Sequence, residues 1–190
     1  MELTVWLGLL ASALFISISP GPGAIFSISQ GTLYGFKRAM FSVAGLQLGL
    51  VSQILFLLFG LGVLINQFPS VFIVIKILGM MYLIVLGILQ WLKKIEQIDT
   101  NEDHQSLSFR PLKALLQGFF VNLTNIKGTV FFLALIPLFI DLTALKLSTC
   151  IIFTATLILI DLIGMAGYVT LAQVSKTLLA DPKKYYGKID

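Results

Sequence analysis

Two long stretches without a charged residue limit what this chain can fold into. They cover residues 3–36 and 39–75, and only Lys37 and Arg38 separate them. Each is longer than the roughly 20 apolar residues that cross the hydrocarbon core of a bilayer as a helix. Lipid offers the backbone no hydrogen bonds, so such segments span a membrane as α-helices. Hydrophobic residues make up 57% of the chain and the mean hydropathy is +0.97. We therefore predict an all-α integral membrane protein that is embedded in a lipid bilayer.

The apolar runs and the turns between them predict a polytopic bundle of five transmembrane helices. We place them at about residues 3–29, 39–65, 70–92, 112–139 and 147–175, which together make a transporter domain over residues 1–175. Residues 93–111 form a predicted cytoplasmic loop and residues 176–190 a basic cytoplasmic tail. Lys and Arg gather around residues 37–38, 93–113 and 176–188, all on one side, whereas Lys146 lies on the other. The positive-inside rule then puts the N-terminus outside and Asp190 in the cytoplasm.

The segment 19–23, Ser-Pro-Gly-Pro-Gly, interrupts the first predicted helix. Proline lacks an N–H and clashes with the carbonyl four residues earlier, so the carbonyls of Ile16 and Ile18 lose their helical partners. Irregular backbone at membrane depth occurs where it is packed in protein or lines a polar cavity. In many secondary transporters such a break forms the substrate site. We therefore predict a substrate-binding role for Pro20, Gly21, Pro22 and Gly23, with a simple packing kink as the alternative.

A second polar cluster, Asn122, Asn125 and Lys127, lies in the fourth predicted helix. Lys127 is about 20 Å along a helix from Lys113 at its cytoplasmic end, which is well inside the ~30 Å hydrocarbon core. Lysine at that depth costs at least ~2.5–3.5 kcal/mol unless it faces water or a partner, so it marks a candidate site. Snorkelling to an interface is the alternative. The three side chains do not share one helix face, so a break at residues 125–126 is needed to bring them to one cavity.

Asp161 is the one acidic residue clearly inside a predicted helix, the fifth. It could pair with Lys127, couple transport to protons or bind a substrate ammonium, and a Lys127–Asp161 salt bridge that only stabilises packing is the alternative. An ammonium and a carboxylate within the membrane suit a zwitterionic amino acid as the substrate. Polar residues of the second helix, Gln47, Ser52 and Gln53, could line the same cavity.

The sequence argues against several other classes of function. It has no Ser/His/Asp or Cys/His set, no phosphate-binding glycine loop and no carboxylate pair, so we predict neither an enzyme nor a bound cofactor. The single cysteine, Cys150, gives no metal-ligand spacing and no disulfide. The basic residues read as topology signals and not as a nucleic-acid surface. Gly45 and Gly49 form a small-residue pair, which we interpret as packing within the chain, with a homo-oligomer as the alternative.

Several blocks of the sequence resemble the LysE/RhtB family of amino-acid exporters, nearest to the homoserine/homoserine-lactone and threonine efflux branch. The blocks that carry the resemblance are Ser-Ile-Ser-Pro-Gly-Pro-Gly-Ala at 17–24, Ala-Gly-Leu-Gln-Leu-Gly-Leu at 44–50 and Phe-Val-Asn-Leu-Thr-Asn-Ile-Lys-Gly at 120–128. The resemblance implies six helices in two inverted three-helix repeats, with the first and third blocks as equivalent breaks that meet at the site. It also implies efflux of a small amino acid across the bacterial inner membrane, driven by protons.

This chain departs from the family pattern at two places. Ile126 stands where the family usually has proline, so we expect the fourth helix to be less sharply broken. The chain ends at Asp190, where relatives continue into a sixth helix. Two alternatives to an amino-acid exporter therefore stay open: a truncated or non-transporting membrane subunit, and a metal-cation exporter of the same superfamily. The latter would need several acids in the broken helices, and the first and fourth predicted helices contain none.

The working hypothesis for the site assigns one role to each group. Lys127 and the N–H groups near Gly23 hold the substrate carboxylate, the freed carbonyls near Ile16 hold its ammonium, and Asp161 exchanges the proton.

Overall fold

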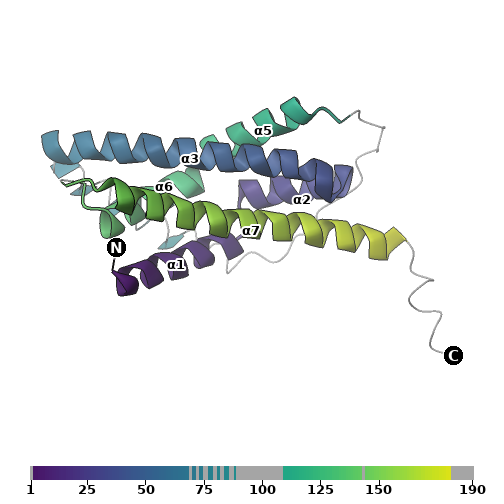
Figure 1. Cartoon of the computed structure of the whole chain (residues 1–190), viewed down its shortest axis with the longest axis horizontal. Helices are drawn as coiled ribbons and strands as arrows, with labels where there is room; N and C mark the ends of the chain where they lie inside the picture. The colour runs from purple at the N-terminus through teal and green to yellow at the C-terminus, as the bar shows by residue number, and fades with distance from the viewer. Residues whose placement is uncertain are drawn as a thin grey trace.

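The computed structural model of the chain is an elongated bundle of α-helices (Figure 1). The structure describes residues 2–68, 109–142 and 144–180. It also describes scattered positions between 70 and 88, and these scattered positions are helical. Most of the predicted third helix, nearly all of the predicted 93–111 loop and residues 181–190 lie outside the described residues.

Within the described ranges the chain forms helices α1 (Leu3–Ile18), α2 (Pro22–Tyr34), α3 (Phe36–Gln67), α5 (Pro111–Leu123), α6 (Ile126–Phe139) and α7 (Leu147–Ala180). The predicted helix at 3–29 is thus two helices that meet at the Pro-Gly segment, and the second of them continues to Tyr34. The predicted helix at 112–139 is also two helices. Both breaks lie near the middle of the bundle's long axis. The pair α1–α2 runs along this axis in one direction and the pair α5–α6 in the other (Figure 1).

Length and composition make this bundle a membrane protein. Two apolar helical stretches of the described chain, Pro22–Gly62 and Leu147–Thr177, are long enough to cross a membrane, and the bent pair α5–α6 makes a third if it counts as one span. Large apolar side chains such as Phe15, Phe56 and Phe59 are about three-quarters exposed, as expected for side chains in contact with lipid. α1 has 16 residues and α2 has 13, so they are about 24 Å and 20 Å long. Neither crosses a ~30 Å core alone.

A single residue, Gly35, turns the chain from α2 back along α3. Its φ of 73° and ψ of 172° are available almost only to glycine. The hydroxyl of Ser42 donates to the side chain of Gln30 across this hairpin, at 3.2 Å. The two helices therefore run antiparallel and belong to separate passes, as the Lys37–Arg38 boundary predicts.

Glycines let α3 and α5 approach closely. A Cβ at Gly45 would overlap the carbonyl of Leu115, and one at Gly118 would overlap the carbonyl of Ser42. A Cβ at Gly49 would lie only 2.5 Å from the oxygen of Phe119. The pair Gly45 and Gly49 therefore serves packing within the chain, as we interpreted it from the sequence.

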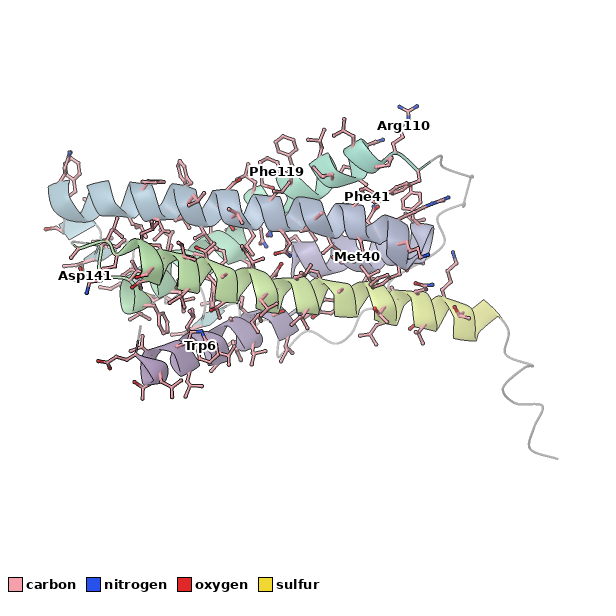
Figure 2. The ribbon with its side chains drawn as sticks, in the orientation of Figure 1. Trp6, Met40, Phe41, Arg110, Phe119 and Asp141 are labelled. Carbon is pink, nitrogen blue, oxygen red and sulfur yellow. The ribbon has the colours of Figure 1, made fainter. Side chains whose placement is uncertain are left out.

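Arg38, Arg110 and Lys176 lie at one end of the bundle (Figure 2). Arg38 lies over the ring of Phe109, with 5.7 Å between the guanidinium carbon and the ring centroid. At the same end, the Lys176 ammonium donates to the carbonyl of Thr32 at 2.8 Å. Figure 2 shows Arg110 near this end, whereas Asp141 lies at the opposite end.

The last helix is longer than the sequence suggested. We placed a polar tail from residue 176 onward, but α7 continues to Ala180. Pro182 is the first residue beyond 175 that would break a helix. Lys176 and Gln173 also bind the α2–α3 turn, because the Gln173 side-chain oxygen accepts from the N–H of Phe36 at 2.9 Å. These contacts hold the end of α7 against the bundle.

Two apolar clusters fill the interior, one on each side of the helix breaks. One includes Leu9, Leu50 and Phe153, and draws on α1, α3, α6 and α7. The other includes Ala24, Leu46 and Val169, and draws on α2, α3 and α7. The polar residues described next lie where these clusters meet, since Leu46 and Leu50 both line the cavity there.

Candidate functional site

A small cavity of about 60 Å³ lies between the two helix breaks. Six of the predicted site residues line it, with parts of α1, α2, α3, α5, α6 and α7: Gly21, Gly23, Asn122, Asn125, Lys127 and Asp161. Pro20 and Pro22 do not line it and are exposed. These prolines shape the backbone around the cavity. At roughly 10–15 Å³ per water molecule, the cavity has room for a few waters and none for an amino acid.

The first break leaves three residues, 19–21, outside the helices. α1 ends at Ile18, Ser19 and Gly21 have extended dihedral angles, and Pro22 begins α2. Proline fits a first helical position because the N–H that it lacks would have no partner there. The break therefore turns the carbonyl end of α1 and the N–H end of α2 towards the same region.

The second break forms around Asn125 without a proline. Asn125 has extended dihedral angles, and its side-chain oxygen accepts from the N–H of Gly128 at 3.3 Å, as an N-cap of α6 does. The pair α5–α6 is bent by 53°. Ile126 therefore does not prevent the break, because the asparagine cap supplies the helix start. The Asn122 side chain lies one turn earlier and donates to the carbonyl of Leu46 at 2.8 Å.

Lys127 reaches from α6 across to the first break. Its ammonium donates to the carbonyl of Ser19 at 2.6 Å. The side chain lies beside Gly21, where a Cβ would be 3.4 Å from the lysine Cδ. The ammonium is therefore bound at the carbonyl end of α1, and the snorkelling alternative does not describe its position.

Tyr168 of α7 binds the same end of α1. Its hydroxyl lies 2.8 Å from the carbonyl oxygen of Ile18 and 3.4 Å from that of Ser17. Proline removes the helical partner of Ile18, as predicted, and the tyrosine replaces it. The carbonyl end of α1 thus receives one donor from α6 and one from α7.

Asp161 pairs with an amide and not with Lys127. Its Oδ2 accepts from the side-chain nitrogen of Gln47 on α3 at 2.7 Å. Because Asp161 and Lys127 bind different partners, the structure contradicts the alternative of a packing salt bridge between them. Asp161 keeps its place in the cavity wall.

Of the other two polar residues proposed for the cavity, only Gln53 supports it, from outside. The Gln53 amide donates to the Asn125 carbonyl at 3.2 Å and to the Thr129 hydroxyl at 2.6 Å. It thereby fixes the start of α6. Ser52 instead binds the carbonyl of Leu48 on its own helix at 2.9 Å and takes no part in the site.

Comparison with known proteins identifies the family. The model of the LysE type translocator family matches residues 14–188. The chain belongs to this family. No solved structure gives a significant match to it.

Curated relatives cover most of this translocator. An uncharacterized membrane protein of Vibrio cholerae is 38% identical over 90% of the chain and 82% of its own length. A protein of Salmonella typhimurium named homoserine/homoserine lactone efflux protein is 37% identical over 94% of the chain and 85% of its own length. A leucine efflux protein of Klebsiella pneumoniae is 34% identical over 73% of the chain and 65% of its own length.

Sequence reasoning missed the contact that Tyr168 makes in this translocator. The signal that could have found it is spacing: Asp161, Gly164 and Tyr168 are three and then four residues apart, which places them on one face of α7. A Cβ at Gly164 would overlap the Ser17 hydroxyl, so α7 packs directly on the end of α1. The acid and the tyrosine therefore face the same region of the bundle.

Taken together, the site combines a cation, a carboxyl group and the ends of two half-helices. Backbone N–H groups at the start of α2 attract an anion, and carbonyls at the end of α1 attract a cation. No bond-breaking chemistry is needed to explain these groups. The arrangement suits reversible binding of a small ligand that carries both charges.

Proposed function

We propose that this translocator exports small neutral amino acids such as homoserine, homoserine lactone or threonine by exchange with protons. The observation that carries the proposal is the cavity between two oppositely directed helix breaks, with Lys127 and Asp161 in its wall. The names of the Salmonella and Klebsiella relatives support amino-acid efflux.

In this proposal the two charged ends of the substrate bind different half-helices. The carboxylate binds Lys127 and the N–H groups at the start of α2, near Gly23, and the ammonium binds the carbonyl end of α1. The cavity of about 60 Å³ is smaller than an amino acid. Substrate enters only after helices around the breaks move apart.

Asp161 is the proposed proton carrier. It lines the cavity, and its described partner is the neutral amide of Gln47. A carboxyl group with a neutral partner can gain or lose a proton without breaking an ion pair. Such intramembrane acids serve proton relays in pumps and transporters.

For orientation, we propose that the basic end of the bundle faces the cytoplasm of a bacterial cell and that the N-terminus lies outside the inner membrane. The contacts of Arg38 and Lys176 at one end support this, because cytoplasmic loops carry the excess of Lys and Arg.

The proposal is tested by efflux of radiolabelled homoserine, threonine and leucine from preloaded bacterial cells that express Met1–Asp190. We expect faster efflux of at least one amino acid than from empty cells, and loss of the difference with a proton uncoupler. Lys127→Ala is expected to abolish efflux while leaving membrane insertion intact. Lys113→Ala, which changes an exposed lysine on α5, serves as the matched control. Undiminished efflux from Lys127→Ala would refute the role of Lys127, and efflux that resists the uncoupler would refute proton exchange.

A further inference from the structure

The position of the Lys127 ammonium is the observation from which this inference starts. The proposed function gives the carbonyl end of α1 to the ammonium of the substrate. In the described state that place already holds an ammonium, because Lys127 donates to the carbonyl of Ser19 at 2.6 Å. The carbonyl end of a helix is the negative end of its dipole, so it attracts either cation.

The first break leaves room for this lysine. The dihedral angles of Gly21, φ −130° and ψ −171°, are extended and open to any residue. Backbone conformation therefore does not require a glycine at this position. A Cβ there would lie 3.4 Å from the Lys127 Cδ and 3.7 Å from its Nζ, which is ordinary van der Waals contact, so the lysine side chain passes directly beside this residue.

We propose that Lys127 is a built-in competitor for the ammonium subsite, and that it gives way only to a ligand with an acceptor oxygen next to its ammonium. The substrate's ammonium replaces the lysine at the Ser19 carbonyl. The released Lys127 then binds the carboxylate of the same ligand, or the ring carbonyl of a lactone. This inference rests on the proposed function, since it assigns a selection rule to that site.

The selection rule follows from the cost of an unpaired charge. A simple amine could replace Lys127 at the carbonyl, but it would offer no acceptor to the lysine that it displaces. An ammonium without a partner inside a membrane protein is strongly disfavoured. An amino acid supplies that acceptor on the carbon that bears its own ammonium. The exchange therefore keeps both cations paired only when the ligand brings an acceptor with it.

Binding of a matched pair of ligands tests the rule. The pair is homoserine and 3-aminopropan-1-ol, which is homoserine without its carboxylate. Titration calorimetry on the purified full chain in lipid nanodiscs would measure both dissociation constants. We expect wild type to bind homoserine at least tenfold more tightly than the amine. In Lys127→Met the competitor is gone, so affinity for the amine should rise about tenfold while affinity for homoserine falls.

Two further variants keep the test decisive. Lys127→Gln retains a neutral donor in case the methionine variant does not fold, and it should also bind the amine more tightly than wild type. Lys113→Met removes an exposed lysine and should change neither dissociation constant. If folded Lys127→Met or Lys127→Gln binds the amine no better than wild type, the competitor role is wrong. If wild type binds no homoserine but the variants gain affinity for the amine, the competitor role stands and the proposed substrate is wrong.

Discussion

Replacing Gly49 with alanine should separate α3 from α5. The new Cβ would lie 2.5 Å from the oxygen of Phe119 and 3.0 Å from the Cβ of Asn122, whereas ordinary contact begins at 3.4 Å. Two backbones meet here, so no flexible side chain can move aside. We expect the helices to part by about 1 Å, which is the kind of shift that overpacking imposes.

The expected cost follows from that shift. Overpacking typically costs ~1–3 kcal/mol. The bond from Asn122 to the Leu46 carbonyl, now 2.8 Å, would stretch out of hydrogen-bonding range, at ~0.6 kcal/mol for an average bond between membrane helices. Alanine regains up to ~1 kcal/mol of helix propensity. The net loss of stability should therefore be about 1–3 kcal/mol.

Gly60→Ala provides the matched control on the same helix. It is exposed, and a Cβ there meets no atom within 4 Å, so we expect no loss of stability. Reversible unfolding in mixed micelles with increasing SDS would measure both variants, and the efflux assay would show whether the displaced Asn122 impairs transport. Equal stability of Gly49→Ala and Gly60→Ala would refute the backbone contact between α3 and α5.

Two further substitutions test single features of the fold. Tyr168→Phe removes the donor to the Ile18 carbonyl, so we expect ~0.6–1.7 kcal/mol of lost stability and slower efflux. Tyr34→Phe should change neither, and equal unfolding midpoints of the two variants would contradict the capping role. Gly35→Ala forces a side chain into dihedral angles that only glycine tolerates, so it should lower the stability by ~1–3 kcal/mol in the same unfolding titration. Gly167→Ala, with no atom within 4 Å of its Cβ, should not lower it. A Gly35→Ala variant as stable as wild type would show that the turn adapts.

The helix breaks could be predicted from the sequence because they depend on local chemistry. Pro20 and Pro22 remove N–H groups wherever the rest of the chain lies, so a break between α1 and α2 follows from covalent structure. The break at Asn125 was expected from a different argument, that Asn122, Asn125 and Lys127 could share a cavity only if the helix bends. Its sharpness was underestimated because the asparagine cap replaces the missing proline.

The partners of the polar side chains could not be predicted in the same way. Lys127 has a flexible four-carbon stem that allows many acceptors within reach, and its sequence position does not select the Ser19 carbonyl. The contact from Tyr168 to Ile18 joins residues 150 positions apart. Such pairs depend on how α1, α6 and α7 pack together, and a single sequence gives no distance between helices.

The one-residue turn at Gly35 bears on the order in which the chain is assembled. Contacts between α2 and α3 are local, so this hairpin can form while the rest of the protein is still being synthesised. Two backbone groups of this hairpin have their side-chain partners on α7. The N–H of Phe36 bonds Gln173, 137 residues later, and the carbonyl of Thr32 bonds Lys176, 144 residues later. Until α7 is inserted, these two groups can form their hydrogen bonds only with water. The last described helix to leave the ribosome is thus the one that fastens the first hairpin.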